Sequence, residues 1–303
     1  MAAPRAVLVP APAKINLVLA VLGNRPDGFH EIRSWMVPLA LADRLRVERA
    51  PRGLRLEVSG AEGLDGPENL AYRAAADFIA RYGRPAGARL RLDKRVPVAA
   101  GLGGGSSDAA ATLLGLARLA EIDDPEGLAG LAERLGSDVP FFLARRPAWV
   151  SGRGETVEPA PRPPPLGLLL VKPPFGICAA SAYAAWRPSR LTRSRPSVNP
   201  WSNGGPSRED EAVLTVETVA AMLRNDLQAG VVRTRPELRS VLARLAQAGA
   251  CGVAMSGSGS TCFGLFRGPR EARLAAARFV RRPGETLLVT RPAARPGAVR
   301  ILG

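Results

Sequence analysis

A glycine-rich loop between a predicted strand and a predicted helix constrains the fold of this chain more than any other stretch. The loop reads Pro97-Val98-Ala99-Ala100-Gly101-Leu102-Gly103-Gly104-Gly105-Ser106-Ser107-Asp108. Alternating leucines predict a strand over residues 88–96, and an apolar run predicts a helix over residues 109–120. Glycines allow close approach of the backbone to a ligand, and N–H groups at a helix start favour an anion. The loop therefore predicts a phosphate site, with a flexible turn and a serine helix cap as the alternative interpretation.

The loop differs from three widespread nucleotide-binding patterns. No Gly-Lys-Ser/Thr sequence follows it, which excludes a Walker A loop. Ser106 stands at the third glycine position of the dinucleotide-binding pattern, so that pattern also fails. The single histidine, His30, precedes Glu31, and the chain therefore lacks the His-Arg-Asp catalytic loop of protein kinases.

Length and composition predict a globular protein without a membrane segment. The 303 residues allow one large core or two modest ones. No run of about 18 apolar residues occurs, and the first residues lack the apolar centre of a signal peptide. The three cysteines, Cys178, Cys251 and Cys262, have no CxxC spacing. We therefore expect a cytoplasmic protein with free thiols and without a cysteine metal site.

The positive charge of the chain comes almost entirely from arginine. The formal net charge is +15, and the only lysines are Lys14, Lys94 and Lys172. The arginines are scattered over many segments, which indicates a bias of composition, and we expect no nucleic-acid partner. Because an ammonium is a compact point charge, a lysine retained at position 14 suggests a site that needs that group.

Apolar periodicity predicts an α+β chain in two parts. In the first part we expect strands over 13–22, 29–41 and 44–58. Pro10 and Pro12 are expected to break the earlier apolar run, 6–9. Helices are expected over 69–82, 109–120 and 125–135. A hairpin over 148–158 precedes a proline-rich stretch, 159–165, that predicts a domain boundary. The second part is expected to contain a surface loop over 187–208, helices over 213–223, 236–249 and 271–279, and strands over 166–171, 252–266 and 286–290. We therefore expect domains of residues 1–160 and 161–303.

Several motifs, taken in order, resemble the GHMP kinase superfamily, whose members phosphorylate hydroxyl groups of small molecules. The superfamily motifs are Pro12–Asn16, the glycine loop and the turn Met255–Ser260. Within the superfamily, Asp27–His30 and Gly136–Pro140 resemble the kinases that act on 4-diphosphocytidyl-2-C-methyl-D-erythritol in the non-mevalonate route to isoprenoid precursors. The resemblance implies a ribosomal-protein-like α/β N-terminal domain, a ferredoxin-like C-terminal domain and an active site in the cleft between them.

The resemblance also implies which residues carry phosphoryl transfer. Residues Pro97 to Ser107 would hold the phosphates of ATP, with Mg²⁺ as the accompanying ion, and Asn69 would lie near the adenine. Asp138 would accept the proton of the substrate hydroxyl, and Lys14 beside it would orient that hydroxyl. Asn16, on the same strand face as Lys14, would bind the substrate. The alternatives are a solvated Lys14 and helix capping by Asp138, by Asn69 or by the two loop serines, which could instead help to hold magnesium.

A second group of residues is implied in recognition of the substrate's cytosine. Phe29 and His30 resemble the aromatic–histidine pair that stacks on the base and hydrogen-bonds to it, with Tyr183 as a second stacking face. The turn from Ser256 to Ser260 would pack across the cleft near the substrate phosphates, or serve only as a tight hairpin. A purely structural role is the alternative for His30.

Three other functions compete with this interpretation. A mevalonate or homoserine kinase of the same superfamily would have no cytosine to recognise, so the pair Phe29-His30 argues against it. A basic nucleic-acid-binding protein would give no reason for the settings of Lys14 and Asp138. Those two residues also argue against a scaffold that binds nucleotide without turnover.

Overall fold

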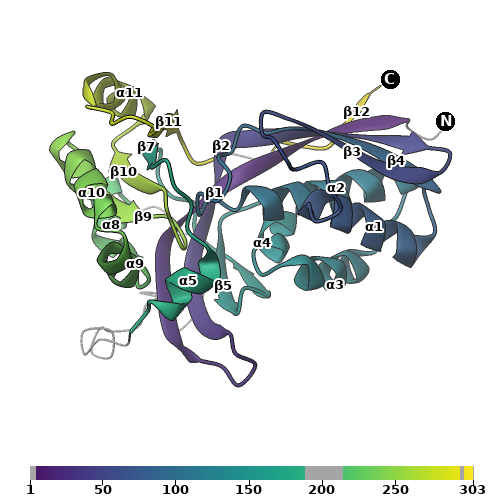
Figure 1. The fold of residues 1–303 in the computed structure, drawn as a ribbon, viewed down its shortest axis with the longest axis horizontal. Helices are drawn as coiled ribbons and strands as arrows, with labels where there is room; N and C mark the ends of the chain where they lie inside the picture. The colour runs from purple at the N-terminus through teal and green to yellow at the C-terminus, as the bar shows by residue number, and fades with distance from the viewer. Residues whose placement is uncertain (1–4, 188–213, 294–296, 303) are drawn as a thin grey trace.

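The computed structural model describes residues 5–187, 214–293 and 297–302. These residues form a sheet of eight strands and a smaller sheet of four, with helices packed on both (Figure 1). The α+β class expected from the sequence is confirmed. Residues 188–208 of the expected surface loop lie outside the described residues.

Two long strands, β1 (Ala6–Asn24) and β2 (His30–Ala50), form an antiparallel hairpin that connects the two halves of the molecule. The predicted break in β1 is wrong, because the strand continues through Pro10 and Pro12, which pair with Arg44 and Ala42. In the described residues, β1 has a neighbouring strand on only one side at these positions. A proline that lacks its N–H therefore removes no ladder bond there.

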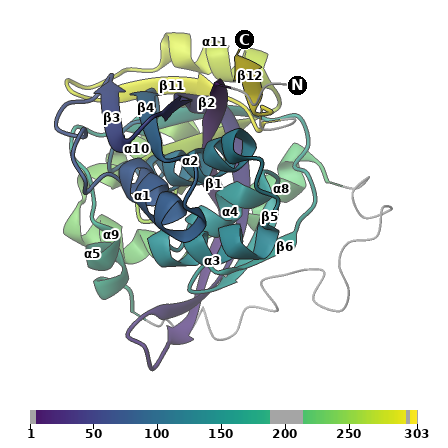
Figure 2. The ribbon, with the colours of Figure 1, turned by 90° about the vertical axis from the view of Figure 1, so that its right-hand side faces the viewer.

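The large sheet is covered on one face by four helices, as the two views show (Figures 1 and 2). Its order is β12-β1-β2-β4-β3, with β5 on β2 and β6 on β5; the strands are β3 (Gly53–Ser59), β4 (Gly87–Asp93), β5 (Ala148–Gly152) and β6 (Thr156–Pro159). The helices are α1 (Leu70–Tyr82), α2 (Gly104–Ala120), α3 (Pro125–Leu135) and α4 (Val139–Ala144). Small residues let α2 pack closely on the sheet: a Cβ added at Gly115 would lie 2.8 Å from Val47 Cγ2.

The smaller sheet is antiparallel in the order β11-β7-β10-β9. Its strands are β7 (Gly167–Lys172), β9 (Gly252–Met255), β10 (Cys262–Phe266) and β11 (Thr286–Thr290). Helices α10 (Glu237–Gln247) and α11 (Pro269–Arg278) pack against this sheet, and α5 (Ala179–Ala184), α8 (Val216–Met222) and α9 (Gln228–Thr234) complete this half. Phe263 and Leu265 of β10 share a core with Ile15 of the long hairpin, which joins the two halves.

Two short strands of the second half complete the first sheet. β8 (Arg224–Asn225) runs parallel to β1 at Val18, and β12 (Arg300–Leu302) pairs with the start of β1. Strands of two or three residues are too short to show alternation, which is why the sequence did not predict them. The division into residues 1–160 and 161–303 stays a prediction. No helix among the described residues is both long and apolar enough to span a bilayer. Cys178, Cys251 and Cys262 form no disulfide.

Candidate active site

The glycine loop adopts backbone conformations that favour glycine. Gly101 and Gly103 have φ values of 73° and 71°, and Ala99 shares this left-handed region with a φ of 52°. A Cβ added at Gly101 would lie 2.3 Å from the carbonyl oxygen of Ser256. Glycine is therefore required at position 101 both by its dihedral angle and by the close approach of the second half of the chain.

Backbone bonds from both halves hold the loop in place. Lys14 N of β1 donates to Leu102 O (2.9 Å), and Thr261 N donates to Ala100 O (3.1 Å). Ser256 Oγ donates to Gly101 O (3.0 Å). The turn Ser256–Ser260 therefore packs against the loop, so it is more than a hairpin between two strands.

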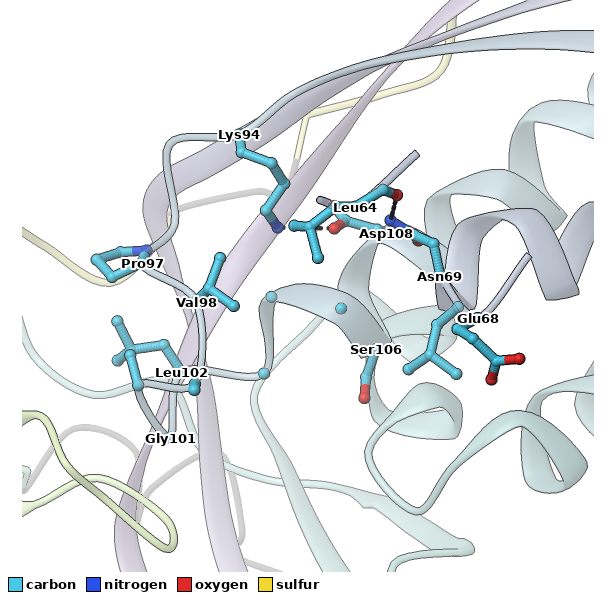
Figure 3. Close-up of a pocket in the computed structure, with 16 residues that line it drawn as sticks. Leu64, Glu68, Asn69, Lys94, Pro97, Val98, Gly101, Leu102, Ser106 and Asp108 are labelled. Carbon is cyan, nitrogen blue, oxygen red and sulfur yellow. Dashed lines mark hydrogen bonds and ion pairs between the residues drawn. The ribbon is translucent and has the colours of Figure 1, made fainter. Parts of the chain in front are cut away.

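The loop borders a cavity of about 380 Å³, shown in Figure 3. Its lining comprises Leu64, Glu68, Asn69, Leu70, Lys94, residues Pro97 to Ser106, and Asp108. Helix α2 begins inside the predicted loop, at Gly104, and its N-cap Gly103 provides no side-chain cap. Its first N–H groups therefore lack side-chain acceptors and are available to an anion in this cavity.

The serines of the loop do not cap α2, so that alternative interpretation is wrong. Ser106 and Ser107 lie inside the first turn, beyond the N-cap position. Ser106 is half-buried beside the cavity, whereas Ser107 is buried and absent from the lining. Asn69 does cap its helix, since its Oδ1 accepts a hydrogen bond from Ala71 N (2.8 Å), and it also lines the cavity. Capping and a nucleotide contact are therefore compatible for Asn69.

Lys14 and Asp138 meet at the end of the loop. Lys14 Nζ lies 3.6 Å from Asp138 Oδ2, and the side chain of Lys14 is only 4 % exposed against 35 % for Asp138. Asp138 occupies the N-cap position of α4 but makes no side-chain capping bond. Its carboxylate instead faces the lysine and remains accessible to a ligand. A Cβ added at Gly103 would lie 3.1 Å from Lys14 Cγ, so this pair adjoins the glycine loop.

Asn16 lies beside Lys14 on the same strand, as the alternation predicts. Lys14 Nζ donates to Asn16 Oδ1 (2.7 Å), and Asn16 Nδ2 donates to Ser34 Oγ on β2 (2.8 Å). Gly257 of the late turn approaches the same group, because a Cβ added there would lie 2.9 Å from Lys14 Nζ. The three superfamily motifs of the sequence therefore converge on one lysine.

An aromatic cluster that includes Tyr183 lies within reach of the Asp138 charge. The rings of His30 and Tyr183 are 5.0 Å apart, and Trp186 meets His30 edge-on at 5.6 Å. Burial, and after it the charge of Asp138, raises the pKa of the Tyr183 phenol above its ordinary value. Phe29 stands apart at the hairpin tip, 47 % exposed, with the Arg153 guanidinium 5.2 Å from its ring centroid. The structure thus brings His30 and Tyr183 together and adds Trp186, a residue that the sequence analysis did not name, whereas Phe29 makes no ring contact with them among the described residues.

Sequence comparisons agree with this geometry. Residues 69–146 match the GHMP kinases N terminal domain, and residues 211–286 match GHMP kinases C terminal. A 4-diphosphocytidyl-2-C-methyl-D-erythritol kinase of Anaeromyxobacter sp. (strain K) is 48 % identical over 268 residues, which cover 88 % of this chain and 82 % of that protein. The kinase of the same name from Pelotomaculum thermopropionicum is 46 % identical over 93 % of this chain and 96 % of its own length.

The chain belongs to the 4-diphosphocytidyl-2-C-methyl-D-erythritol kinase family of GHMP kinases. A solved crystal structure of a 4-(cytidine 5'-diphospho)-2C-methyl-D-erythritol kinase agrees with this membership. It superposes with a TM-score of 0.74 at 39 % identity, over 95 % of this chain and all of the other. The two-domain GHMP kinase fold expected from the motifs is therefore confirmed.

This GHMP kinase carries a buried ion cluster that the sequence analysis did not assign. Lys94 Nζ donates to Asp43 Oδ2 (2.5 Å) and to Asp108 Oδ2 (2.7 Å), and Figure 3 shows Lys94 and Asp108 pointing toward each other. Asp43 Oδ1 also accepts hydrogen bonds from Arg95 N and Val96 N. The cluster therefore joins β2, the end of β4 and the first turn of α2, and it fixes both ends of the loop.

Electrostatics make this cluster sensitive to the loss of any member. Burial raises the pKa of the Asp108 carboxyl; Lys94 opposes this shift and the Asp43 carboxylate adds to it. Burial alone would lower the pKa of Lys94, but attraction to Asp108 and Asp43 raises it above its ordinary value. The one sequence signal for this cluster was that Lys94 is among the three lysines of a chain that otherwise uses arginine.

The loop hydroxyls fit a magnesium ion that accompanies a nucleotide. Ser107 Oγ is buried without a hydrogen-bond partner among the described residues, and Ser106 lies beside the cavity. Hydroxyl oxygens are hard ligands of the kind that Mg²⁺ accepts, usually together with phosphate oxygens and water. The described residues contain no group of three or more His, Cys, Asp or Glu that could hold a metal, so such an ion would depend on the nucleotide for its main ligands.

Proposed function

We propose that this chain transfers the γ-phosphoryl group of ATP to the 2-hydroxyl of 4-diphosphocytidyl-2-C-methyl-D-erythritol, a step of the non-mevalonate route to isoprenoid precursors. The observation that carries this proposal is the pair Lys14 and Asp138 at the end of the glycine loop, 3.6 Å apart. Such a pair supplies a cation and a carboxylate at the point where a γ-phosphate held by the loop would meet an acceptor hydroxyl. The names of the relatives supply the substrate.

The reaction forms one bond and breaks another. The hydroxyl oxygen of the substrate bonds to the γ-phosphorus as the bond from that phosphorus to the β–γ bridging oxygen breaks. Asp138 accepts the hydroxyl proton, and the products are the 2-phosphate ester and ADP. No covalent enzyme intermediate is needed.

The other residues bind and orient the two reactants. The N–H groups at the start of α2 would hold the phosphates of ATP, and the apolar side chains of Leu64, Leu70 and Val98 would line the space for its base. Mg²⁺, bound mainly by the phosphates with the Ser106 hydroxyl beside them, would neutralise charge there, and Ser107 could reach the ion only if its buried hydroxyl turned toward the cavity. Lys14 keeps the Asp138 carboxylate oriented and faces the acceptor hydroxyl, and Asn16 holds Lys14.

The aromatic cluster beside Asp138 suits the cytosine of the substrate. Aromatic faces stack on nucleobases, and an imidazole donates or accepts hydrogen bonds at the edge of a base. His30 and Tyr183 lie together there, and the charge of Asp138 acts on the Tyr183 phenol, so a base held by these rings would belong to a substrate whose hydroxyl end reaches Asp138. Phe29 would have to move toward His30 to add a second stacking surface.

The direct test is release of ADP by the purified chain with ATP, Mg²⁺ and 4-diphosphocytidyl-2-C-methyl-D-erythritol. Mevalonate and homoserine serve as alternative acceptors. We expect turnover with the cytidine compound alone. Turnover with either alternative acceptor would assign another substrate, and a folded protein that binds ATP without turning over any of the three would refute the proposal.

A further inference from the structure

We infer that Ser34 of β2 is a positioning residue for the active-site lysine and acts through Asn16. This inference rests on the function proposed above. Ser34 is fully buried and makes no contact with the glycine-loop cavity. It ends a chain of side-chain hydrogen bonds that starts at Lys14 and crosses from β1 to β2.

The chain consists of three consecutive bonds. Lys14 Nζ donates to Asn16 Oδ1 (2.7 Å), Asn16 Nδ2 donates to Ser34 Oγ (2.8 Å), and Ser34 Oγ donates to Val18 O (2.7 Å). Lys14, Asn16 and Ser34 are 3 %, 4 % and 0 % exposed. Water therefore has little access to replace any of these bonds, and the loss of one leaves a buried polar group without its partner.

The direction of each bond is fixed from both ends. A backbone carbonyl only accepts, so the single hydroxyl hydrogen of Ser34 is committed to Val18 O. Ser34 Oγ then has only acceptor capacity left, and the atom of Asn16 that faces it must be the donating Nδ2. Asn16 Oδ1 consequently faces the ammonium of Lys14, which only donates.

Removing the hydroxyl of Ser34 leaves the amide of Asn16 without this constraint. Its Nδ2 loses a buried acceptor, and a rotated amide would turn a donor toward the Lys14 ammonium. Either result displaces Nζ from the position 3.6 Å from Asp138. The cavity proposed for ATP is lined by neither Lys14, Asn16 nor Ser34, so ATP binding is expected to persist.

The experiment compares the purified wild-type chain with Ser34→Ala, Asn16→Ala and the double variant. For Ser34→Ala we expect kcat to fall about tenfold, because the variant loses one buried hydrogen bond in a charged network. The KM for ATP should stay within twofold of wild type. The double variant should be no slower than Asn16→Ala alone, because Ser34 acts only through Asn16. A merely structural effect of Ser34 would instead multiply with that of Asn16.

Thr290→Val is the matched control. It also removes a buried hydroxyl, on β11, which accepts a hydrogen bond from Leu41 N of β2 (3.1 Å). We expect kcat within twofold of wild type. Ser34→Cys, which nearly keeps the volume, gives the same test if the alanine variant does not fold. A change in kcat below twofold for the Ser34 variants, or multiplied effects in the double variant, would overturn the inference while leaving the proposed function standing. An inactive wild-type chain would overturn both.

Discussion

Replacing Lys94 by methionine would remove the cation that holds two buried carboxyl groups together. Asp43 and Asp108 are 0 % and 2 % exposed, and Lys94 Nζ donates to both. Breaking a buried ion pair by removing one partner costs roughly 3–5 kcal/mol, because the remaining charge has neither water nor a counter-ion. We expect Lys94→Met to lower the free energy of unfolding at pH 7 by about this amount.

The loss should depend on pH with a defined sign. Asp43 keeps two backbone donors, whereas Asp108 Oδ1 has no partner among the described residues. Without Lys94 the folded-state pKa of Asp108 rises further above the unfolded value of about 3.9. In the folded wild type the pKa of Asp108 is already raised to about 8, so wild type and variant both keep this proton between pH 5 and pH 7. Above pH 8 the wild-type carboxyl beside Lys94 gives up its proton while the variant's keeps it, so the loss of stability grows as the pH rises from 7 to 9.

Urea unfolding followed by tryptophan fluorescence at pH 7 and pH 9 measures both quantities. Lys172→Met is the control, since Lys172 is partly exposed on β7 and forms no ion pair within the described residues; its loss should stay below about 1 kcal/mol. A similarly small loss for Lys94→Met at pH 7 would refute the reasoning. So would a large loss of equal size at both pH values.

Three further variants test the site. Asp138→Asn should leave thermal unfolding unchanged but reduce ADP release about 10²- to 10⁴-fold, and retained turnover would place the base elsewhere. Gly101→Ala would put a Cβ 2.3 Å from Ser256 O at a position with a left-handed φ, so the KM for ATP should rise at least about tenfold. Gly28→Ala is the control: its φ is similar but the added Cβ meets open space, so the KM for ATP should stay unchanged. His30→Ala should raise the KM for the cytidine substrate about tenfold and leave that for ATP unchanged; a reversed pattern would remove His30 from base recognition.

Much of the local structure could be predicted from the sequence. Helix α3 and strand β11 have the predicted bounds, and Asn69 caps α1 as one interpretation held. These features depend on neighbours a few residues apart: a capping side chain, a proline at the first turn, an alternation of apolar residues. The motifs also identified Lys14, Asp138 and the glycine loop as one group before any distance was known.

Two local predictions failed because the surrounding structure decided where a strand or a helix begins and ends. Pro10 and Pro12 were expected to end a strand, yet β1 continues because its edge is free at these positions. The serines of the loop were candidate caps, yet α2 begins earlier, at Gly104. The prolines are tolerated because no neighbouring strand needs their N–H groups, and the serines cannot cap α2 because Gly103 already occupies the N-cap position.

The sequence by itself determined the class of fold, the glycine loop and the two side chains that we propose for phosphoryl transfer, because each rests on a short motif. Only the tertiary structure decided which residues hold those side chains in place. Lys94 meets Asp43 across 51 positions, and Asn16 meets Ser34 across 18. Pairings of this kind follow from the register of β1 on β2 and from the packing of α2 on the sheet, and no periodicity within a single element encodes them.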